Sequence, residues 1–431
     1  MVETKITGRI EIPESAVLEV REIKNIFDFK KSIEEKLGGK TSELIEFIIA
    51  GAITLGSSDI HLEPEKEKAK FRVRIDGLLQ DVIFIELKTY QGLVSRIKLL
   101  SKLKLNVNNR PQDGRFSVVL NNTVIEIRTS SLPAEYGESI VMRILDPKSL
   151  ISVESLGLRD DLIKTFDGQI AKPNGMLIVT GPTGSGKTTT LYAILKKLNS
   201  PDIKIITIED PIEYHLEGIS QTQVDSKKGY DFASGLRSIM RQDPDVILVG
   251  EIRDLETAKI ALQAALTGHL VLSTIHTNDA AGTISRLQAL GESPANIAPA
   301  INMAIGQRLV RKICKECAEM KEASPEELDN IKEVLKNISG DIKIPEIKKG
   351  LKIPKAKGCK FCNNTGYKER FGIYEFFLID DNIEKFILTS PSISSLRDLA
   401  VKKGMALMKQ DGFIKILRGL TTIEEVQRVA E

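Results

Sequence analysis

The stretch GPTGSGKT, residues 181–188, decides how the centre of this chain folds. It fits the phosphate-loop pattern G-x-x-x-x-G-K-[ST]. The apolar run MLIVT (176–180) precedes it, and TTTLYAILKKLN (188–199), with helical spacing, follows. A glycine-rich loop between a strand and a helix lets backbone N–H groups and the helix N-terminus surround phosphate oxygens. The stretch therefore predicts an α/β domain that binds a nucleotide, although a glycine-rich turn could match by chance.

Each part of this loop has an expected role. Lys187 would neutralise the β- and γ-phosphates of ATP, and Thr188 would hold Mg²⁺. The residues expected to bind the nucleotide are Gly181, Pro182, Thr183, Gly184, Ser185, Gly186, Lys187, Thr188 and Thr189.

Three further apolar runs follow the loop, at 203–208, 245–250 and 270–276. They are apolar on both faces, which is typical of a parallel sheet buried under helices. Carboxylates at the carboxyl ends of such strands lie where α/β sheets bind nucleotides. Glu251 could order the Mg²⁺ shell and polarise the attacking water, and Glu209 could do the same.

Other polar residues near these strand ends leave alternatives open. The carboxylates, with Asp210 and Glu213 among them, could instead cap helices or pair with Arg253 and Arg241. His276 ends the run 270–276 at the expected edge, where it could sense the γ-phosphate. A histidine beside a strand is more often structural, and this alternative applies equally to His269.

Residues 41–146 have a different pattern. Apolar spacing predicts a helix over 41–57, capped by Thr41 or Ser42. Alternating runs at 70–77, 81–87, 114–120, 123–130 and 139–145 predict antiparallel strands, with a helix at 92–105 between them. This part is therefore expected to be an α+β domain. Its basic stretch 88–115 is either a solvated helix face or a surface that meets nucleotide or a neighbouring subunit.

Composition excludes some classes of protein. Lys and Arg number 61 and Asp and Glu 59, so the whole molecule has no strong attraction to nucleic acid or anionic lipid. The N-terminus has no signal-peptide pattern. The longest apolar stretch, 44–56, is too short to span a bilayer and contains Glu46. We expect a cytoplasmic protein whose membrane contact is peripheral or through partners.

The chain has 4 cysteines, arranged as two Cys-x-x-Cys pairs. Four thiolates favour one tetrahedral zinc ion, and disulfides are rare in a reducing cytosol. Redox chemistry and an iron–sulfur cluster are the alternatives. In the polar insert between the pairs, Ser324, Pro325 and Glu327 predict the start of a helix over 324–338. The expected zinc ligands are Cys314, Cys317, Cys359 and Cys362.

These patterns divide the chain into six parts. They are a short extension (1–40), the α+β domain (41–146), a linker (147–165), the P-loop core (166–309), a zinc-binding subdomain (310–375) and a helical C-terminal region (376–431). The predicted fold class is thus multidomain α/β.

Several segments together resemble one protein family. GPTGSGKTTT, TIEDPIEY, LRSIMRQDPDVILVGEIRD (236–254) and TGHLVLSTIHTNDA (267–280) resemble the secretion ATPases of type II secretion and type IV pilus assembly. RPQDGRF (110–116) and IRTSSLPAEYGESIVMRIL (127–145) resemble the N-terminal domain of that family. The likeness covers about residues 41–431.

The resemblance implies a PAS-like N-terminal domain followed by a RecA-like ATPase core. It also implies a homo-hexameric, Mg²⁺-dependent ATPase at the cytoplasmic face of the inner membrane, which turns a membrane platform protein. In the family an acidic box (here Glu209, Asp210 and Glu213), Glu251 and the two histidines line the nucleotide. Arginines from the N-terminal domain close over the phosphates, and the matching positions are Arg115 and Arg128.

Two other functions remain as alternatives. Related RecA-like motors serve DNA uptake or translocation, although the basic stretch 88–115 has no aromatic platform for nucleic acid. A nucleotide-binding scaffold without catalysis is the other, and intact Lys187, Thr188 and Glu251 argue against it. Pilus-retraction ATPases resemble the core but lack the four-cysteine insert, which favours assembly or export. Family members commonly carry a large further N-terminal docking domain, whereas only about 40 residues precede the likeness here, so we expect either that docking uses another surface or that the chain is a short variant.

Overall fold

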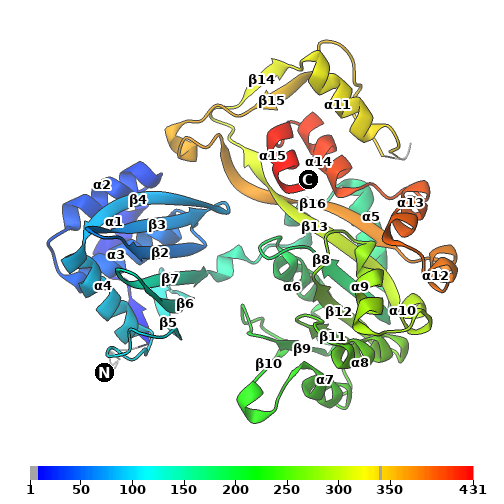
Figure 1. Cartoon of the computed structure of the whole chain (residues 1–431), viewed down its shortest axis with the longest axis horizontal. Helices are drawn as coiled ribbons and strands as arrows, with labels where there is room; N and C mark the ends of the chain where they lie inside the picture. The colour runs from blue at the N-terminus through cyan, green and yellow to red at the C-terminus, as the bar shows by residue number, and fades with distance from the viewer. Residues whose placement is uncertain (1–7, 339–341, 431) are drawn as a thin grey trace. The chain divides into compact units, whose positions relative to one another are not determined.

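The computed structural model describes residues 8–338 and 342–430, which form two compact units (Figure 1). The first unit holds the described residues up to Ser149, together with Cys314–Cys317 and Lys357–Lys368; the second holds the rest. Residues 1–7, which begin the segment without a signal-peptide pattern, lie outside the described residues. Within the described ranges, no helix combines the length and apolar character needed to cross a membrane.

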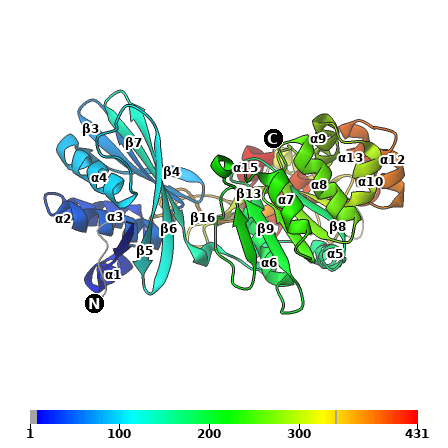
Figure 2. The ribbon, with the colours of Figure 1, turned by 90° about the horizontal axis from the view of Figure 1, so that it is seen from below.

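The first unit is built on a seven-stranded sheet in the order β1-β5-β6-β7-β2-β3-β4. β1 runs parallel to β5, whereas the neighbouring pairs from β5 to β4 are antiparallel. Helices α3 and α4 lie over one face of this sheet (Figure 2). The elements are β1 (Arg9–Glu11), α1 (Glu14–Arg21), α2 (Ile26–Lys36), α3 (Thr41–Thr54), β2 (Asp59–Pro64), β3 (Lys68–Ile75), β4 (Leu78–Glu86), α4 (Leu87–Leu100), β5 (Gln112–Leu120), β6 (Thr123–Ala134) and β7 (Gly137–Leu145).

The antiparallel strands expected from alternation are confirmed, and so is the helix that begins at Thr41. The predicted cap of that helix is wrong. A capping residue needs an extended backbone, and this conformation falls on Lys40, so Thr41 and Ser42 are already helical. The second helix covers Leu87–Leu100 rather than 92–105. Alternation did not reveal β2, which pairs with both β3 and β7.

The second unit has a seven-stranded sheet in the order β10-β9-β11-β12-β8-β13-β16. The strands from β10 to β13 are parallel to their neighbours. Both faces are covered: Met176 and Ile178 pack into one hydrophobic cluster, and Leu177 and Val179 into another. This confirms the buried parallel sheet. Its strands are β8 (Gly175–Thr180), β9 (Ile205–Glu209), β10 (Ser220–Gln223), β11 (Val246–Val249), β12 (Leu270–Ile275), β13 (Ile301–Ile313) and β16 (Tyr367–Leu378).

Helices of the second unit supply the covering layers and the C-terminal part. Residues of α5 and α6 join the cluster on one face of the sheet, and residues of α7 to α10 join the other. The helices are α5 (Asp160–Ile170), α6 (Lys187–Leu198), α7 (Phe232–Met240), α8 (Leu255–Leu266), α9 (Gly282–Leu290), α10 (Pro294–Ala300), α12 (Asp381–Ile387), α13 (Ile393–Lys402), α14 (Met408–Leu417) and α15 (Ile423–Ala430).

The insert between the cysteine pairs contains helix α11 (Pro325–Leu335) and the antiparallel strands β14 (Glu319–Glu322) and β15 (Lys352–Lys355). The predicted start of α11 is confirmed. Ser324 caps it, Pro325 is its first residue, and Glu327 completes a capping box with Ser324.

Candidate nucleotide site and metal centre

The phosphate loop joins β8 to α6 and has the backbone shape that its glycines allow. Gly184 and Gly186 have φ values of +79° and +88°, a region that L side chains rarely adopt. A Cβ atom at Gly186 would lie 2.8 Å from Gln307 Nε2. The loop is therefore held in a conformation that only glycine permits at these positions.

Lys187 begins α6 and bends back over the loop. Its Nζ atom donates to the carbonyl oxygens of Gly181 (2.9 Å) and Pro182 (3.1 Å). Burial lowers the pKa of Lys187, and the carboxylate of Glu251 partly opposes that shift. Thr188, the next residue of α6, is exposed at the start of the helix. Lys187 thus lies against the phosphate loop, and Thr188 is exposed beside it.

Strand order brings two other chain segments beside the loop. β12 lies between β8 and β11, and all three are parallel, so their carboxyl ends meet at one edge of the sheet. Thr180, the last residue of β8, accepts a hydrogen bond at Oγ1 from the amide of Thr277 (2.9 Å). The segment after β12 is therefore attached to the strand that leads into the phosphate loop.

Glu251 follows β11 at this edge and contacts basic side chains. Its Oε2 atom lies 3.7 Å from His276 Nε2, and its other oxygen accepts a hydrogen bond from Arg253. Arg253 also lies 3.9 Å from a carboxylate oxygen of Asp210. Burial lowers the pKa of His276, and the positive charge of Lys187 lowers it further. Glu251, His276 and Arg253 form one polar cluster beside the phosphate loop.

Glu209 ends β9 in a different environment. Only 3% of the residue is exposed. Its carboxylate accepts hydrogen bonds from Thr207 (2.6 Å), Gln221 (3.2 Å) and the hydroxyl of Tyr192. Burial raises the pKa of Glu209 despite these donors. The two carboxylates therefore have different environments. Glu251 contacts cationic side chains at the sheet edge, whereas Glu209 is enclosed by neutral groups.

The two histidines lie at opposite ends of β12. His269 immediately precedes the strand, and its Nδ1 atom is 3.0 Å from the carbonyl oxygen of Ala264 on α8. The phosphate loop follows the carboxyl end of the parallel strand β8, so it is at the other edge of the sheet. His276 lies with the loop, and His269 does not.

The first unit carries a row of arginines across three strands. Arg115 on β5 is directly opposite Arg128 on β6, and Arg128 is opposite Arg143 on β7. Glu126 lies 4.0 Å from Arg115 and 3.4 Å from Arg128. Like charges opposite each other on a sheet destabilise it. Asp59 lies 3.1 Å from Arg143, a member of the row that the sequence analysis missed, so two carboxylates offset part of the repulsion among the three arginines.

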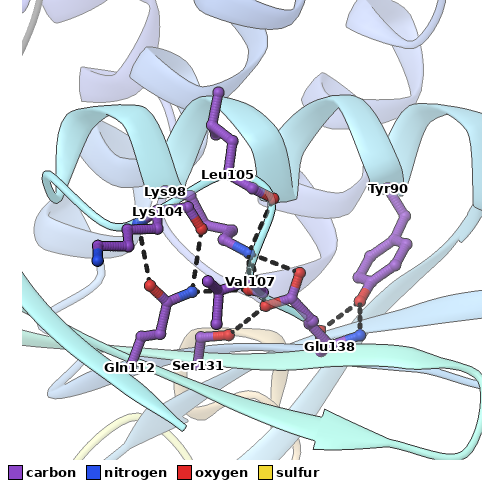
Figure 3. Close-up of polar contacts among 8 residues, drawn as sticks. All are labelled: Tyr90, Lys98, Lys104, Leu105, Val107, Gln112, Ser131 and Glu138. Atoms are coloured by element: carbon purple, nitrogen blue, oxygen red, sulfur yellow. Dashed lines mark hydrogen bonds and ion pairs between the residues drawn. The ribbon is translucent and has the colours of Figure 1, made fainter. Parts of the chain in front are cut away.

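A buried ion pair holds the chain segment that leads into β5 (Figure 3). Lys98 on α4 is 1% exposed, and its Nζ atom lies 2.9 Å from both carboxylate oxygens of Glu138. The same ammonium donates to the carbonyl of Val107 (2.7 Å). Gln112, the first residue of β5, also donates to Val107 (2.8 Å). These bonds fix the loop before the strand that carries Arg115.

The four cysteines of the two pairs come together in the first unit. Their sulfur atoms all lie within 4.8 Å of one another, and three of the separations are 3.9, 3.8 and 3.7 Å. Zinc with four thiolates at about 2.3 Å requires sulfur atoms roughly 3.8 Å apart. The donor set and its spacing therefore fit one tetrahedral zinc ion. The four residues are Cys314, Cys317, Cys359 and Cys362.

Backbone amides surround one of these sulfurs. The N–H groups of Cys359 and Gly366 each donate to Cys362 Sγ at 3.2 Å. Burial alone would raise the pKa of Cys362, but the two amides, together with hydrogen bonds from the thiols of Cys359 and Cys317, lower the pKa to about 7. These contacts favour a thiolate, the form that binds metal, at Cys362, whereas burial raises the pKa of Cys314 and of Cys317.

Comparison with known proteins agrees with this site. The sequence matches the family described as "Type II/IV secretion system protein" over residues 34–428. This chain belongs to that family. "Type II secretion system protein E" of Xanthomonas campestris pv. campestris is 44% identical over 389 residues, which are 90% of this chain and 67% of the relative. "Type IV pilus assembly ATPase TfpB" of Acinetobacter baylyi is 42% identical over 389 residues, which are 90% of this chain and 65% of the relative.

This secretion ATPase therefore spans about two thirds of the length of both relatives. Among solved structures, the "Pilus Retraction Motor PilT and Bound ADP" is 28% identical, with a TM-score of 0.59 over 89% of this chain and 96% of that one. Family membership and the phosphate loop together make the chain an ATPase.

Proposed function

We propose that this secretion ATPase is a hexameric, Mg²⁺-dependent motor that powers type IV pilus assembly or type II protein secretion. The observation that carries the proposal is the phosphate loop beside Glu251 and His276, in a chain of this family. We further propose that the first unit is PAS-like and the second is RecA-like, with zinc at the four cysteines.

In this proposal each residue at the sheet edge has one task. Lys187 would leave the carbonyls of its own loop and neutralise the terminal phosphates of ATP. Thr188 would hold Mg²⁺, which neutralises phosphate charge when it is bound with the nucleotide. Glu251 would orient the attacking water, because, unlike Glu209, it is not enclosed by neutral donors. His276 would sense the γ-phosphate.

The arginine row supplies the remaining positive charge. An arginine placed against the γ-phosphate stabilises the charge that spreads over it in the transition state. Arg115 and Arg128 would have this task, and Arg143 extends their row.

The machine partners follow from the family. The two relatives are named for type II secretion and for pilus assembly. We therefore propose that the motor acts at the cytoplasmic face of the inner membrane through a platform protein, with peripheral attachment through its partners. A closed four-thiolate zinc site has no open position for substrate, so its role would be structural.

The decisive experiment compares the parent protein with Lys187→Ala. Purified parent should hydrolyse ATP only with Mg²⁺ and should form hexamers by analytical ultracentrifugation. In the host, Lys187→Ala should abolish pilus assembly or secretion while the protein level stays unchanged. If DNA or RNA stimulates the ATPase and neither pili nor secretion is lost, the chain is a nucleic-acid motor instead.

A further inference from the structure

The segment that carries His276 is held by the C-terminal part of the second unit. After β12 the chain runs through residues 276–281 to α9, and we call this segment the histidine loop. Asp279 pairs with Arg397 of α13, and the amide of Ala280 donates to Glu375 of β16 (2.7 Å). Together with the bond from Thr277 to Thr180, these contacts hold the loop at both ends.

Glu375 makes the deeper of the two C-terminal contacts. The residue is 4% exposed, and its second carboxylate oxygen accepts a hydrogen bond from the amide of Met408 (3.1 Å), the first residue of α14. One carboxylate thus joins the histidine loop to the N-terminus of a C-terminal helix. Burying a carboxylate is costly unless it is hydrogen-bonded, so both amides matter to its stability.

Residues of β13 leave space for the side chain of Glu375 and also hold the histidine loop. A Cβ atom at Gly306, on β13, would lie 2.7 Å from Glu375 Cγ. Glycine is therefore required there for Glu375 to reach Ala280. Arg308, two residues further along β13, donates to the carbonyl oxygen of Asn278 (2.7 Å). The middle of the loop is thus also held by β13.

We infer that Glu375 is a positioning residue for ATP hydrolysis, acting through the histidine loop, with the Asp279–Arg397 pair as a second support. Glu375 holds Ala280 from one side and Thr180 holds Thr277 from the other, so the backbone that carries His276 is fixed beside Glu251. The inference rests on the proposed phosphate-sensing role of His276. It goes beyond that role because it assigns the positioning of His276 to residues of β16, α13 and α14.

A double-mutant cycle tests the inference. Glu375→Gln keeps the size of the side chain, but its NH₂ group must face one of the two amide hydrogens. We expect this variant to lower kcat about tenfold, a coupling of ordinary size for residues in one network, while the Kd for ATP changes less than twofold. If Glu375 acts through His276, Glu375→Gln should lower kcat little further in a His276→Ala background.

The matched control is Glu425→Gln. Glu425 is 1% exposed and, like Glu375, accepts a hydrogen bond from a backbone amide, that of Arg311 (2.9 Å), but it does not contact the histidine loop. Its substitution should lower the thermal stability without changing the effect of His276→Ala. A second test variant, Arg397→Gln, removes the support from α13 at a side chain that is 40% exposed, where folding is not at risk.

The outcomes separate the two ideas. If His276→Ala alone leaves turnover unchanged, the sensing role is wrong and the inference falls with it. A second outcome is that His276→Ala slows turnover and that the double variant loses kcat by the product of the two single reductions. In that case the sensing role stands and the positioning inference is overturned. The inference is also overturned if Glu375→Gln folds and keeps the parental kcat. If Glu375→Gln does not fold, the inference is overturned when Arg397→Gln keeps the parental kcat.

Discussion

His276 Nε2 lies 3.7 Å from Glu251 Oε2, at the sheet edge that the phosphate loop also occupies. The imidazole can bridge the carboxylate expected to orient water and the phosphate expected at Lys187. The neutral ring and its protonated form would act differently here, because only the protonated ring forms an ion pair with Glu251. Two predictions follow from this contact.

The first prediction concerns Glu251. Glu251→Gln keeps the shape of the side chain and loses its charge, so it should bind ATP normally and hydrolyse it on the order of 100-fold more slowly. Steady-state hydrolysis and nucleotide binding measure the two effects separately. Glu256→Gln, which changes an exposed carboxylate paired with Arg237, serves as the control. Parental turnover in Glu251→Gln would remove this residue from the catalytic role.

The second prediction concerns pH. Burial and Lys187 lower the pKa of His276 below its ordinary value of about 6.5. At a pH between the folded-state and unfolded-state pKa values of His276, the unfolded chain binds more protons than the folded one. The stabilisation that comes from keeping His276 neutral is therefore complete above about pH 6.5 and is lost as the pH falls through the folded-state pKa. Turnover should fall in the same window, because protonated His276 would pair with Glu251. A His276→Gln variant should lack this acid-side fall; a fall as steep as that of the parent would assign it to another group.

The third prediction concerns the arginine row. Arg128→Ala should reduce kcat by at least tenfold while the affinity for ATP changes little, because an arginine at the γ-phosphate acts mainly in the transition state. Arg72, which pairs with Glu63 and Asp81 in the same sheet, supplies the control Arg72→Ala. Equal turnover in the two variants, with hexamers intact, would make the row an ordinary surface feature.

The fourth prediction concerns the metal. Elemental analysis should find one zinc per chain, and Cys359→Ser should lower it, increase proteolysis within 310–375 and leave ATP binding intact. Phe361→Ala is the control, because Phe361 lies between two ligands and is 45% exposed. Absorbance typical of iron–sulfur, or a zinc content near zero after chelator-free purification, would contradict the assignment.

The fifth prediction concerns the buried pair of the first unit (Figure 3). Lys98→Met leaves the carboxylate of Glu138, whose side chain is only 12% exposed, without its cation and should lower the free energy of unfolding by about 3–5 kcal/mol. The double variant Lys98→Met/Glu138→Gln should recover part of that loss. Lys88→Met, an exposed position on the same helix, should change stability little. Chemical denaturation measures all three, and a mild effect of Lys98→Met would mean that water replaces the ammonium.

Local patterns in the sequence indicated several elements of the fold and the residue types of its candidate sites. Apolar runs on both faces indicated the parallel strands, and the spacing of glycines before Lys187 indicated the phosphate loop, because these signals depend on neighbouring residues alone. The cysteine pairs likewise indicated the cluster of four thiols. The predicted cap of the helix at Thr41 was wrong because the cap does not depend on neighbouring residues alone. Which residue has the extended backbone of a cap depends on the path of the preceding chain.

Only the tertiary structure decided which residues meet. It enclosed Glu209 under Tyr192 while leaving Glu251 beside His276, although both carboxylates follow similar apolar strands. It aligned Arg143 with Arg128 through strand register, which no local pattern specifies. It also brought Glu375 to Ala280, residues far apart in the chain, through the strands β13 and β16 that periodicity did not reveal. Such contacts depend on strand order and packing, so a sequence read segment by segment cannot contain them.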